Sequence, residues 1–211
     1  MDMIDPAIQA YAERYTSPED ALLSEAASYT RAHYKEHHML SGHLQGKFLE
    51  MISWMIRPRR VLEIGTFTGY SALCLAKGMA PDGELHTIEL READSAKARE
   101  YFNASFTGRI ISHTGNALDL IPVIGETWDL VFIDADKVSY IEYFKLVLPR
   151  VRQNGFILAD NVFFHGQVLD EQTKNKNAKA ITAFNEYLRE RQDIDKVMIT
   201  IRDGLFLIRK L

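Results

Sequence analysis

The sequence predicts an α/β protein with a doubly wound, mostly parallel sheet that ends in an antiparallel hairpin. Beyond about residue 58, short apolar runs alternate with longer amphipathic segments, and the last two runs flank a tight-turn signal. At roughly 150 residues per domain, the 211 residues fit one unit. We therefore expect a single domain, 1–211, with a helical N-terminal cap (1–57) and an α/β core (58–211).

The cap region carries helix signals. Residues 17–20 (Ser-Pro-Glu-Asp) combine a capping hydroxyl, a proline suited to the first helical position and acids for the first turn, which predicts a helix that begins at Pro18 and is capped by Ser17. A second helix is expected from about Leu44 to Ile56, before Pro58 stops it. Its apolar residues recur at helical spacing: Leu44, Phe48, Met51, Ile52 and Met55.

The core contains short apolar runs that we interpret as buried strands. They cover residues 61–64, 85–88, 110–113, 130–133 and 156–159. Their starts lie 20 to 26 residues apart, which leaves room for a helix between successive strands. This alternation predicts a parallel sheet covered by helices on both faces.

The end of the chain differs from this alternation. Two strand-like runs, 196–201 and 205–208, are separated only by Arg202-Asp203-Gly204. Because Asp-Gly is a common hairpin turn, we expect an antiparallel pair at the end of the sheet.

Composition and charge exclude several classes of protein. The net charge of −4 gives no attraction to polyanions, so we expect no nucleic-acid partner. The single cysteine, Cys74, is unable to form an internal disulfide, which fits a reducing compartment. Residues 1–6 lack a basic start, and no apolar run approaches the ~20 residues of a membrane span. We expect a cytoplasmic protein that does not associate with membranes.

Ligands of open α/β sheets bind beyond the carboxyl ends of the strands, and small or acidic residues stand at these positions here. The first strand runs into a glycine turn, residues 63–71, where the backbone can approach a ligand closely. The second ends at Glu89, suited to accept both hydroxyls of a ribose. The third leads to Gly115-Asn116-Ala117, which could lie along an adenine edge. Together these features predict a nucleoside-bearing cofactor.

The glycine turn indicates which cofactor. It follows E-x-G-x-x-x-G, with Glu63 two residues before Gly65, and not the G-x-G-x-x-G of dinucleotide sites. A carboxylate in the cleft would repel a pyrophosphate and would suit a cationic cofactor such as S-adenosylmethionine (SAM). Two alternatives remain open: an NAD(P)-dependent oxidoreductase and a non-catalytic nucleoside-binding domain.

The fourth and fifth strands end in oxygen-bearing side chains. Asp134 follows one, and Asp160 with Asn161 follows the other. Such hard ligands suit Mg²⁺, Ca²⁺ or Mn²⁺ and leave about three coordination positions for a substrate and water. Lys137 stands three residues after Asp134, and a nearby dication would lower the pKa of its ammonium towards that of a general base.

At these residues the chain resembles the cation-dependent, SAM-dependent O-methyltransferases, the family of catechol and caffeoyl-CoA O-methyltransferases and their bacterial relatives. The resemblance covers nearly the whole chain. Its most specific carrier is D-A-D-K at 134–137 followed by D-N at 160–161. The other carriers are residues 39–47, 61–65, 69–71, Glu89 and 115–117.

The resemblance implies a role for each matching residue. The cofactor would be bound by residues spread over the strand ends: Met39, Ser41, Glu63, Gly65, Ser71, Glu89, Asn116, Ala117 and Asp134. Met39 and Ser41 would cover its methionine end, Glu63 and Gly65 would line its tail, and Ser71 would meet its carboxylate. The divalent cation would be held by Asp134, Asp160 and Asn161. Lys137 would take the proton from the substrate hydroxyl.

The resemblance also implies a seven-stranded Rossmann-like sheet, a homodimer and a small catechol-like phenol as methyl acceptor. Residues 1–35 and 162–177 match no family pattern. Because these segments would shape the acceptor pocket, the sequence leaves the identity of the acceptor open.

Overall fold

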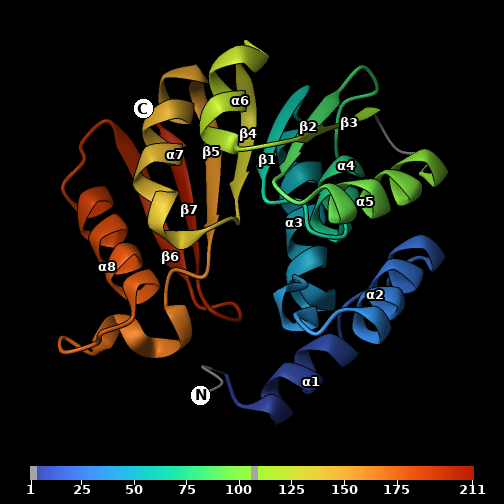
Figure 1. Ribbon diagram of the computed structural model, residues 1–211, viewed down its shortest axis with the longest axis horizontal. Helices are drawn as coiled ribbons and strands as arrows, with labels where there is room; N and C mark the ends of the chain where they lie inside the picture. The colour runs from blue at the N-terminus through green and yellow to red at the C-terminus, as the bar shows by residue number, and fades with distance from the viewer. Residues whose placement is uncertain (1–3, 106–108) are drawn as a thin grey trace.

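The computed structural model describes residues 4–105 and 109–211, which form a seven-stranded sheet with helices on both faces (Figure 1). Residues 1–3, part of the N-terminal sequence considered for targeting, lie outside the described residues. The spatial order of the strands is β3-β2-β1-β4-β5-β7-β6. The strand bounds are β1 Arg60–Ile64, β2 Glu84–Glu89, β3 Arg109–Thr114, β4 Trp128–Ile133, β5 Val151–Asp160, β6 Ile194–Ile199 and β7 Leu205–Lys210.

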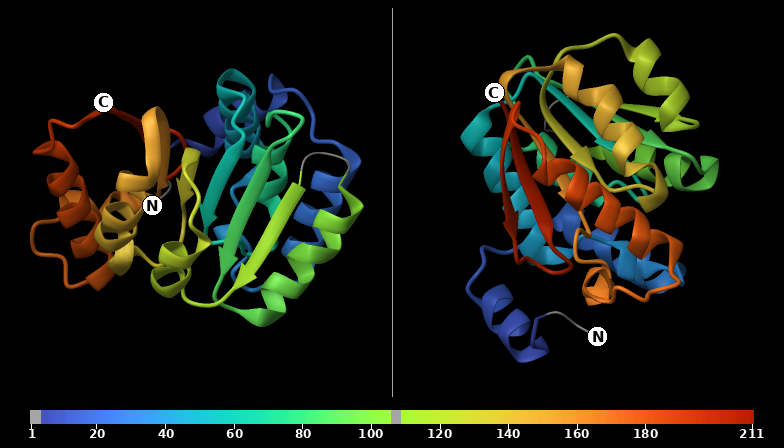
Figure 2. Two further views of the ribbon diagram at one scale, coloured as in Figure 1. Left: turned by 90° about the horizontal axis from the view of Figure 1, so that it is seen from above. Right: turned by 90° about the vertical axis from the view of Figure 1, so that its left-hand side faces the viewer.

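The pairing of the strands confirms the predicted architecture. Strands β1 to β5 pair in parallel, with Ile64 of β1 between Ile88 of β2 and Ile133 of β4. The hairpin β6–β7 joins antiparallel through β7, which lies beside β5. Figure 2 shows this hairpin at one edge of the sheet and β3 at the opposite edge.

Alternate residues of the strands face two hydrophobic cores, one on each side of the sheet. Leu62 belongs to the core that contains Phe144 of α7 and Phe184 of α8. Its neighbour Val61 belongs to the core that contains Leu73 of α4. The helices are α1 Pro6–Arg14, α2 Ala21–His33, η1 His37–Met39, α3 Gly42–Ile56, α4 Tyr70–Ala76, α5 Glu92–Ala104, α6 Ala117–Ile124, η2 Lys137–Ser139, α7 Tyr140–Val147, η3 Leu148–Arg150, η4 Phe164–Leu169 and α8 Lys176–Arg189.

The first predicted helix begins later than expected. Helix α2 begins at Ala21, and its cap is Asp20, whose carboxylate accepts a hydrogen bond from the Leu23 amide at 2.9 Å. Ser17 and Pro18 therefore precede the helix, because the aspartate supplies the capping oxygen. Helix α3 ends at Ile56 as predicted, and Arg57 takes a left-handed conformation with φ of 53° before Pro58.

The winding of the sheet reverses between β1 and β4, which are neighbours in space although β2 and β3 intervene in sequence. Ligands of doubly wound sheets bind at such a point, beyond the carboxyl ends of the strands. Among the described residues, no helix is both long and apolar enough to span a bilayer.

Candidate active site

The carboxyl ends of the central strands open into a cavity of about 1110 Å³. Most residues predicted to form the site line this cavity: Met39, Ser41, Gly65, Ser71, Glu89, Asn116, Ala117, Asp134, Lys137, Asp160 and Asn161. Residues of α1 and of the 161–165 segment complete the wall. The structure thus brings together strand ends that lie up to a hundred residues apart in the sequence.

The glycine turn after β1 passes very close to the end of β4. Gly65 has φ of +98°, and a Cβ atom there would lie 2.1 Å from the carbonyl oxygen of Asp134. No side chain fits this space, and L-residues rarely adopt this backbone conformation. The main-chain amide of Asp134 also donates to the Ile64 carbonyl at 2.8 Å. Gly65 therefore allows the Asp134 backbone to lie directly against the floor of the cavity.

Glu89 is held in place by the backbone around it. Its side chain is buried, one oxygen accepts from the Phe67 amide at 2.8 Å, and the other accepts from the Arg91 amide at 3.0 Å. Both carboxylate oxygens keep a further lone pair. Glu89 is thus a fixed acceptor at the end of β2, as a ribose would require.

Further along the wall, the Asn116 side chain caps α6 by accepting from the Leu118 amide at 3.0 Å.

The position of Glu63 differs from the one that the sequence predicted. Its side chain is completely buried below the cavity, and among the described residues it does not belong to the cavity wall. Burial raises its pKa to about 8, against the opposing effect of hydrogen bonds from Ser71 and Thr87. The raised pKa favours the protonated form of this side chain, whereas the sequence predicted a charged carboxylate in the cleft. Its Oε1 atom has no hydrogen-bond partner within the described part of the chain.

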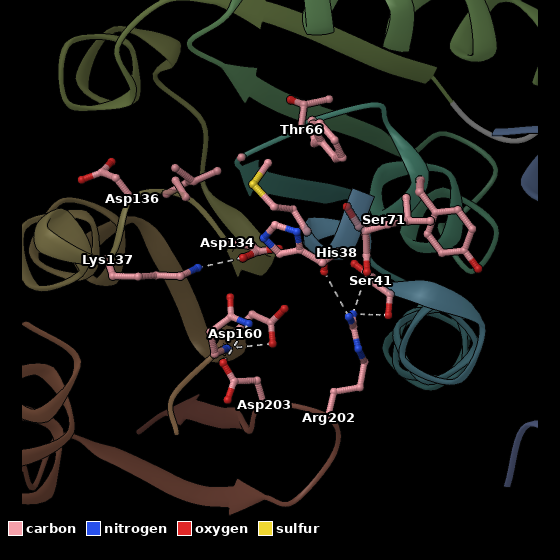
Figure 3. A pocket seen from close by; sticks show the side chains of 18 of the residues that line it. His38, Ser41, Thr66, Ser71, Asp134, Asp136, Lys137, Asp160, Arg202 and Asp203 are labelled. Carbon is pink, nitrogen blue, oxygen red and sulfur yellow. Dashed lines mark hydrogen bonds and ion pairs between the residues drawn. The ribbon is translucent and has the colours of Figure 1, made fainter. Parts of the chain in front are cut away.

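At the end of β4 and β5, acidic and basic groups converge (Figure 3). Lys137 donates to Asp134 Oδ1 at 2.9 Å, and both side chains are largely buried. Asp160 is 3% exposed, and its Oδ1 accepts from the Asn161 amide at 2.8 Å. Burial, followed by repulsion from Asp134, raises the pKa of Asp160 to about 6. Two carboxylates and one ammonium therefore share a poorly solvated corner of the cavity.

The protein groups around Lys137 raise its pKa, and the lowering expected from a nearby dication stays a prediction. Burial acts to lower it, but Tyr140, Asp134 and Asp160 together raise the pKa above its ordinary value. The Nζ atom donates to the Tyr140 hydroxyl at 2.8 Å as well as to Asp134. The lysine is therefore held in its charged form by the carboxylates around it.

The donor set at this corner suits a divalent cation. Among the described residues, no three His, Cys, Asp or Glu side chains are grouped as a metal site. Asp134 and Asp160 could offer carboxylates to such an ion, and Asn161, which is outside that set of residue types, could offer an amide oxygen. Hard oxygen donors of this kind bind Mg²⁺, Ca²⁺ or Mn²⁺. A dication would also offset the repulsion that raises the pKa of Asp160.

Several polar residues of the site had no role in the sequence analysis. Gln45 is fully buried on α3 and donates to Asp160 Oδ2 at 2.8 Å. Tyr140 donates to the Asp160 carbonyl at 3.0 Å. Arg202 and Asp203, read only as part of a turn, line the cavity. For Gln45, the sequence offered one signal, which is a polar residue on the apolar face of α3. Tyr140, Arg202 and Asp203 reach the site through contacts with distant parts of the chain, which no local pattern predicts.

Comparison with known families gives this site a context. A family model described as O-methyltransferase matches residues 13–211. Catechol O-methyltransferase of Niastella koreensis is 34% identical over 160 residues, covering 74% of this chain and 72% of the relative. Probable caffeoyl-CoA O-methyltransferase 1 of Dictyostelium discoideum is 29% identical and covers 97% of this chain and 92% of the relative.

Solved structures of O-methyltransferases superpose closely on this chain. The O-methyltransferase TomG of Streptomyces achromogenes, in complex with SAM, superposes with a TM-score of 0.89 at 30% identity, covering 97% of this chain and 96% of that chain. The O-methyltransferase of Bacillus cereus, in complex with S-adenosylhomocysteine (SAH), gives a TM-score of 0.87 at 28% identity, covering 97% of each chain.

The fold and the strand-end cavity define a doubly wound α/β protein with a site for a nucleoside-bearing ligand. The chain belongs to the O-methyltransferase family. This membership favours methyl transfer over the nicotinamide-dependent oxidoreductase that the sequence left open.

Proposed function

We propose that this protein transfers a methyl group from SAM to a hydroxyl of a small catechol-like phenol. The observation that carries the proposal is the convergence of Asp134, Lys137 and Asp160 in a cavity that Glu89 also lines. A nucleoside site and an acid–base cluster in one cavity are the parts that such a reaction needs. Relatives named catechol and caffeoyl-CoA O-methyltransferase support the acceptor class.

SAM would lie along the ends of β1, β2 and β3. Glu89 would accept its ribose hydroxyls, Asn116 and Ala117 would flank its adenine, and Met39 with Ser41 would cover its methionine end. Ser71 would meet its carboxylate from the first turn of α4. The unpartnered, buried oxygen of Glu63 supports a cationic ligand, because a positive charge above it would favour the ionised carboxylate.

A divalent cation would be held by Asp134, Asp160 and Asn161. When bound, such an ion supplies Lewis-acid polarisation and lowers the pKa of a phenol, which is about 10 in tyrosine. Gln45 would keep Asp160 in its orientation through the 2.8 Å hydrogen bond, so the carboxylate does not have to be ordered when a ligand arrives.

Lys137 would act as the proton acceptor for the substrate hydroxyl. To do so, it first has to lose its own proton to solvent. A cation held by Asp134 would compete with the Lys137–Asp134 contact and would favour this loss by charge repulsion. The methyl acceptor oxygen would then attack in line with the departing sulfur. Because phenolate and sulfonium charges neutralise each other in this step, a partly dry cavity favours it. Positioning of the two reactants can contribute ~7–11 kcal/mol.

A labelled-methyl assay tests the proposal directly. The protein, SAM with a labelled methyl group and Mg²⁺ should label catechol, a caffeoyl ester or a flavonoid diol, whereas phenol, which lacks the second hydroxyl, should remain unlabelled. Calorimetric titration should detect binding of SAH and not of NADH. Tight NADH binding without SAH binding, or labelling of no diol, would rule the proposal out.

We also propose a homodimer in the cytoplasm. Met51, Trp54 and Met55 are 52%, 46% and 68% exposed on one side of α3, and contiguous apolar side chains on a surface often mark an interface between proteins. The single cysteine, which is buried, supports a reducing compartment. Sedimentation equilibrium of the wild type and of Met55→Glu tests the dimer: the variant should shift towards the monomer mass.

A further inference from the structure

The turn between β6 and β7 contacts two separate parts of the cavity wall (Figure 3). On one side, the Arg202 guanidinium donates to the carbonyl of Leu40 at 2.8 Å and to that of Ser41. Weaker contacts at 3.4 Å join it to the His38 carbonyl and to Gln45 Oε1. Arg202 thus connects the β6–β7 turn to the 38–41 segment, which lies some 160 residues away in the sequence.

The 38–41 segment has mostly local hydrogen bonds of its own. The Met39 amide bonds to the Glu36 carbonyl at 2.8 Å, and the Leu40 amide bonds to the His37 carbonyl at 3.1 Å. These bonds shape the short η1 turn but do not fix its position over the sheet. A planar, permanently charged guanidinium with several donors is well suited to hold two successive carbonyls.

On the other side, Asp203 holds the 161–165 segment. Its Oδ1 accepts from the His165 amide at 2.6 Å, and its carbonyl accepts from the Phe163 amide at 2.9 Å. The Asn161 side-chain amide lies 3.5 Å from its Oδ2. Asn161, Phe164 and His165 have φ of 58°, 44° and 54°, values that residues other than glycine rarely adopt. Such conformations persist where surrounding contacts fix them, and Asp203 provides three contacts to this segment.

The turn also approaches the acid–base corner. Arg202 lies near Gln45 Oε1, and the amide nitrogen of that same side chain donates to Asp160 Oδ2 at 2.8 Å. Gln45 is fully buried, so this connection is sheltered from water. One turn therefore contacts the segment expected over the methyl donor and the segment that carries Asn161.

From these contacts we infer that Arg202 and Asp203 are positioning residues with separate tasks, an inference that rests on the proposed function. Arg202 holds the 38–41 segment for SAM, and Asp203 holds the 161–165 segment for the cation and the acceptor. The separation follows from the shorter contacts. Arg202 donates to the Leu40 carbonyl at 2.8 Å, whereas its contact with Gln45 is 3.4 Å, and the Asp203 side chain bonds to 161–165. Loss of either side chain then affects one reactant more than the other.

Steady-state kinetics and calorimetry on Arg202→Met and Asp203→Ala test this inference. Arg202→Met removes charge-assisted hydrogen bonds, so it should raise the Kd of SAH and the KM of SAM roughly 10- to 100-fold. The acceptor KM should stay within about twofold of wild type. Asp203→Ala should show the reverse: a raised acceptor KM and half-saturating Mg²⁺ concentration, with the Kd of SAH unchanged.

Conservative variants and a control complete the design. Arg202→Lys and Asp203→Asn should recover part of each loss and remain available if the larger changes prevent folding. Arg209→Met, which removes an exposed arginine paired with Asp195 on the same hairpin, should match wild type. If each variant shifts both reactants equally, or if the Kd of SAH is unchanged in both Arg202 variants, the inference is wrong. Failure of the wild type to bind SAH would instead refute the proposed function.

Discussion

The Nζ atom of Lys137 lies 2.8 Å from the hydroxyl oxygen of Tyr140, one helical turn further along the chain. The Tyr140 hydroxyl in turn donates to the Asp160 carbonyl at 3.0 Å, and the ring packs edge-on against Phe184. Because Tyr140 is completely buried, the hydroxyl has little freedom to move. The lysine is thus oriented by a residue that is anchored in the core of the protein.

Replacement of Lys137 by methionine should lower kcat by ~10²–10⁴-fold, the usual contribution of a positioned proton-transfer group. The aliphatic chain is retained while the amine is lost, so the Kd of SAH should stay close to wild type. Both quantities are measurable with the labelled-methyl assay and calorimetry. Lys145→Met is the matched control, since Lys145 is exposed and paired with Glu142 on the same helix. Full activity of Lys137→Met would exclude the lysine as the base.

Tyr140→Phe should give a smaller effect of the same kind. It removes one hydrogen bond to a charged amine, an interaction worth ~1.5–3 kcal/mol, and so should lower kcat by roughly 10-fold or more. The KM of SAM should not change, because Tyr140 lies beside Lys137 and not along the strand ends that would hold the donor. A purely structural role would instead lower the melting temperature and leave kcat of the folded fraction unaltered.

Much of the site followed from the sequence because it lies at strand ends. A buried strand is recognisable by its apolar run, and the residue after it must reach the edge of the sheet, so Asp134 and Glu89 could be placed without coordinates. Glu63 could not be placed in the same way. It stands within β1, and only the packing of its neighbours decides whether such a residue faces the cavity or lies buried beneath it.

The long-range contacts were beyond sequence reasoning for a related reason. The bond from Gln45 to Asp160 and the bonds from Arg202 to the 38–41 carbonyls join parts of the chain more than a hundred residues apart. No local pattern encodes such partners. The late start of α2 is a local example. Both Ser17 and Asp20 are good capping residues, and the structure shows that the Asp20 carboxylate accepts from the Leu23 amide.

Removal of divalent cations should abolish methyl transfer. After dialysis against EDTA, activity should fall to background and return with Mg²⁺ or Mn²⁺, while SAH binding persists. Cation binding should also raise the melting temperature, because a ligand that binds only the folded state stabilises it. Asp160→Asn should lose this thermal shift, and Asp195→Asn, a change at an exposed carboxylate of β6, should retain it. Turnover that continues in excess EDTA would contradict the cation role.

Glu89→Gln should raise the KM of SAM roughly 10- to 100-fold, as expected for the loss of hydrogen bonds to a charged acceptor. The glutamine amide can replace only one of the two acceptors that now meet the Phe67 and Arg91 amides. The acceptor KM should not change. Glu84→Gln, at the opposite end of the same strand, is the control and should behave as wild type in both titrations. An unchanged KM of SAM in Glu89→Gln would place the ribose elsewhere.

A histidine pair away from the cavity should make stability depend on pH. His86 Nδ1 on β2 lies 3.0 Å from His113 Nε2 on β3, and the rings of His86 and Trp128 pack in a T-shaped arrangement. Burial, and then His113, lower the pKa of His86, although Glu126 and Glu84 act in the opposite direction. Burial lowers the pKa of His113 as well.

A lowered pKa means that the folded state resists protonation that the unfolded chain accepts below its ordinary value of 6.5. The contribution of the two neutral histidines to the free energy of unfolding should therefore be complete above pH 6.5. It should decrease as the pH falls through the lowered pKa values of the folded state. Urea unfolding at pH 7.5, 6.5 and 5.5 measures this slope. The double variant His86→Asn, His113→Asn should have a shallower slope than wild type, and His33→Asn, at the exposed end of α2, should not. Equal slopes in all three proteins would show that other groups control the acid sensitivity.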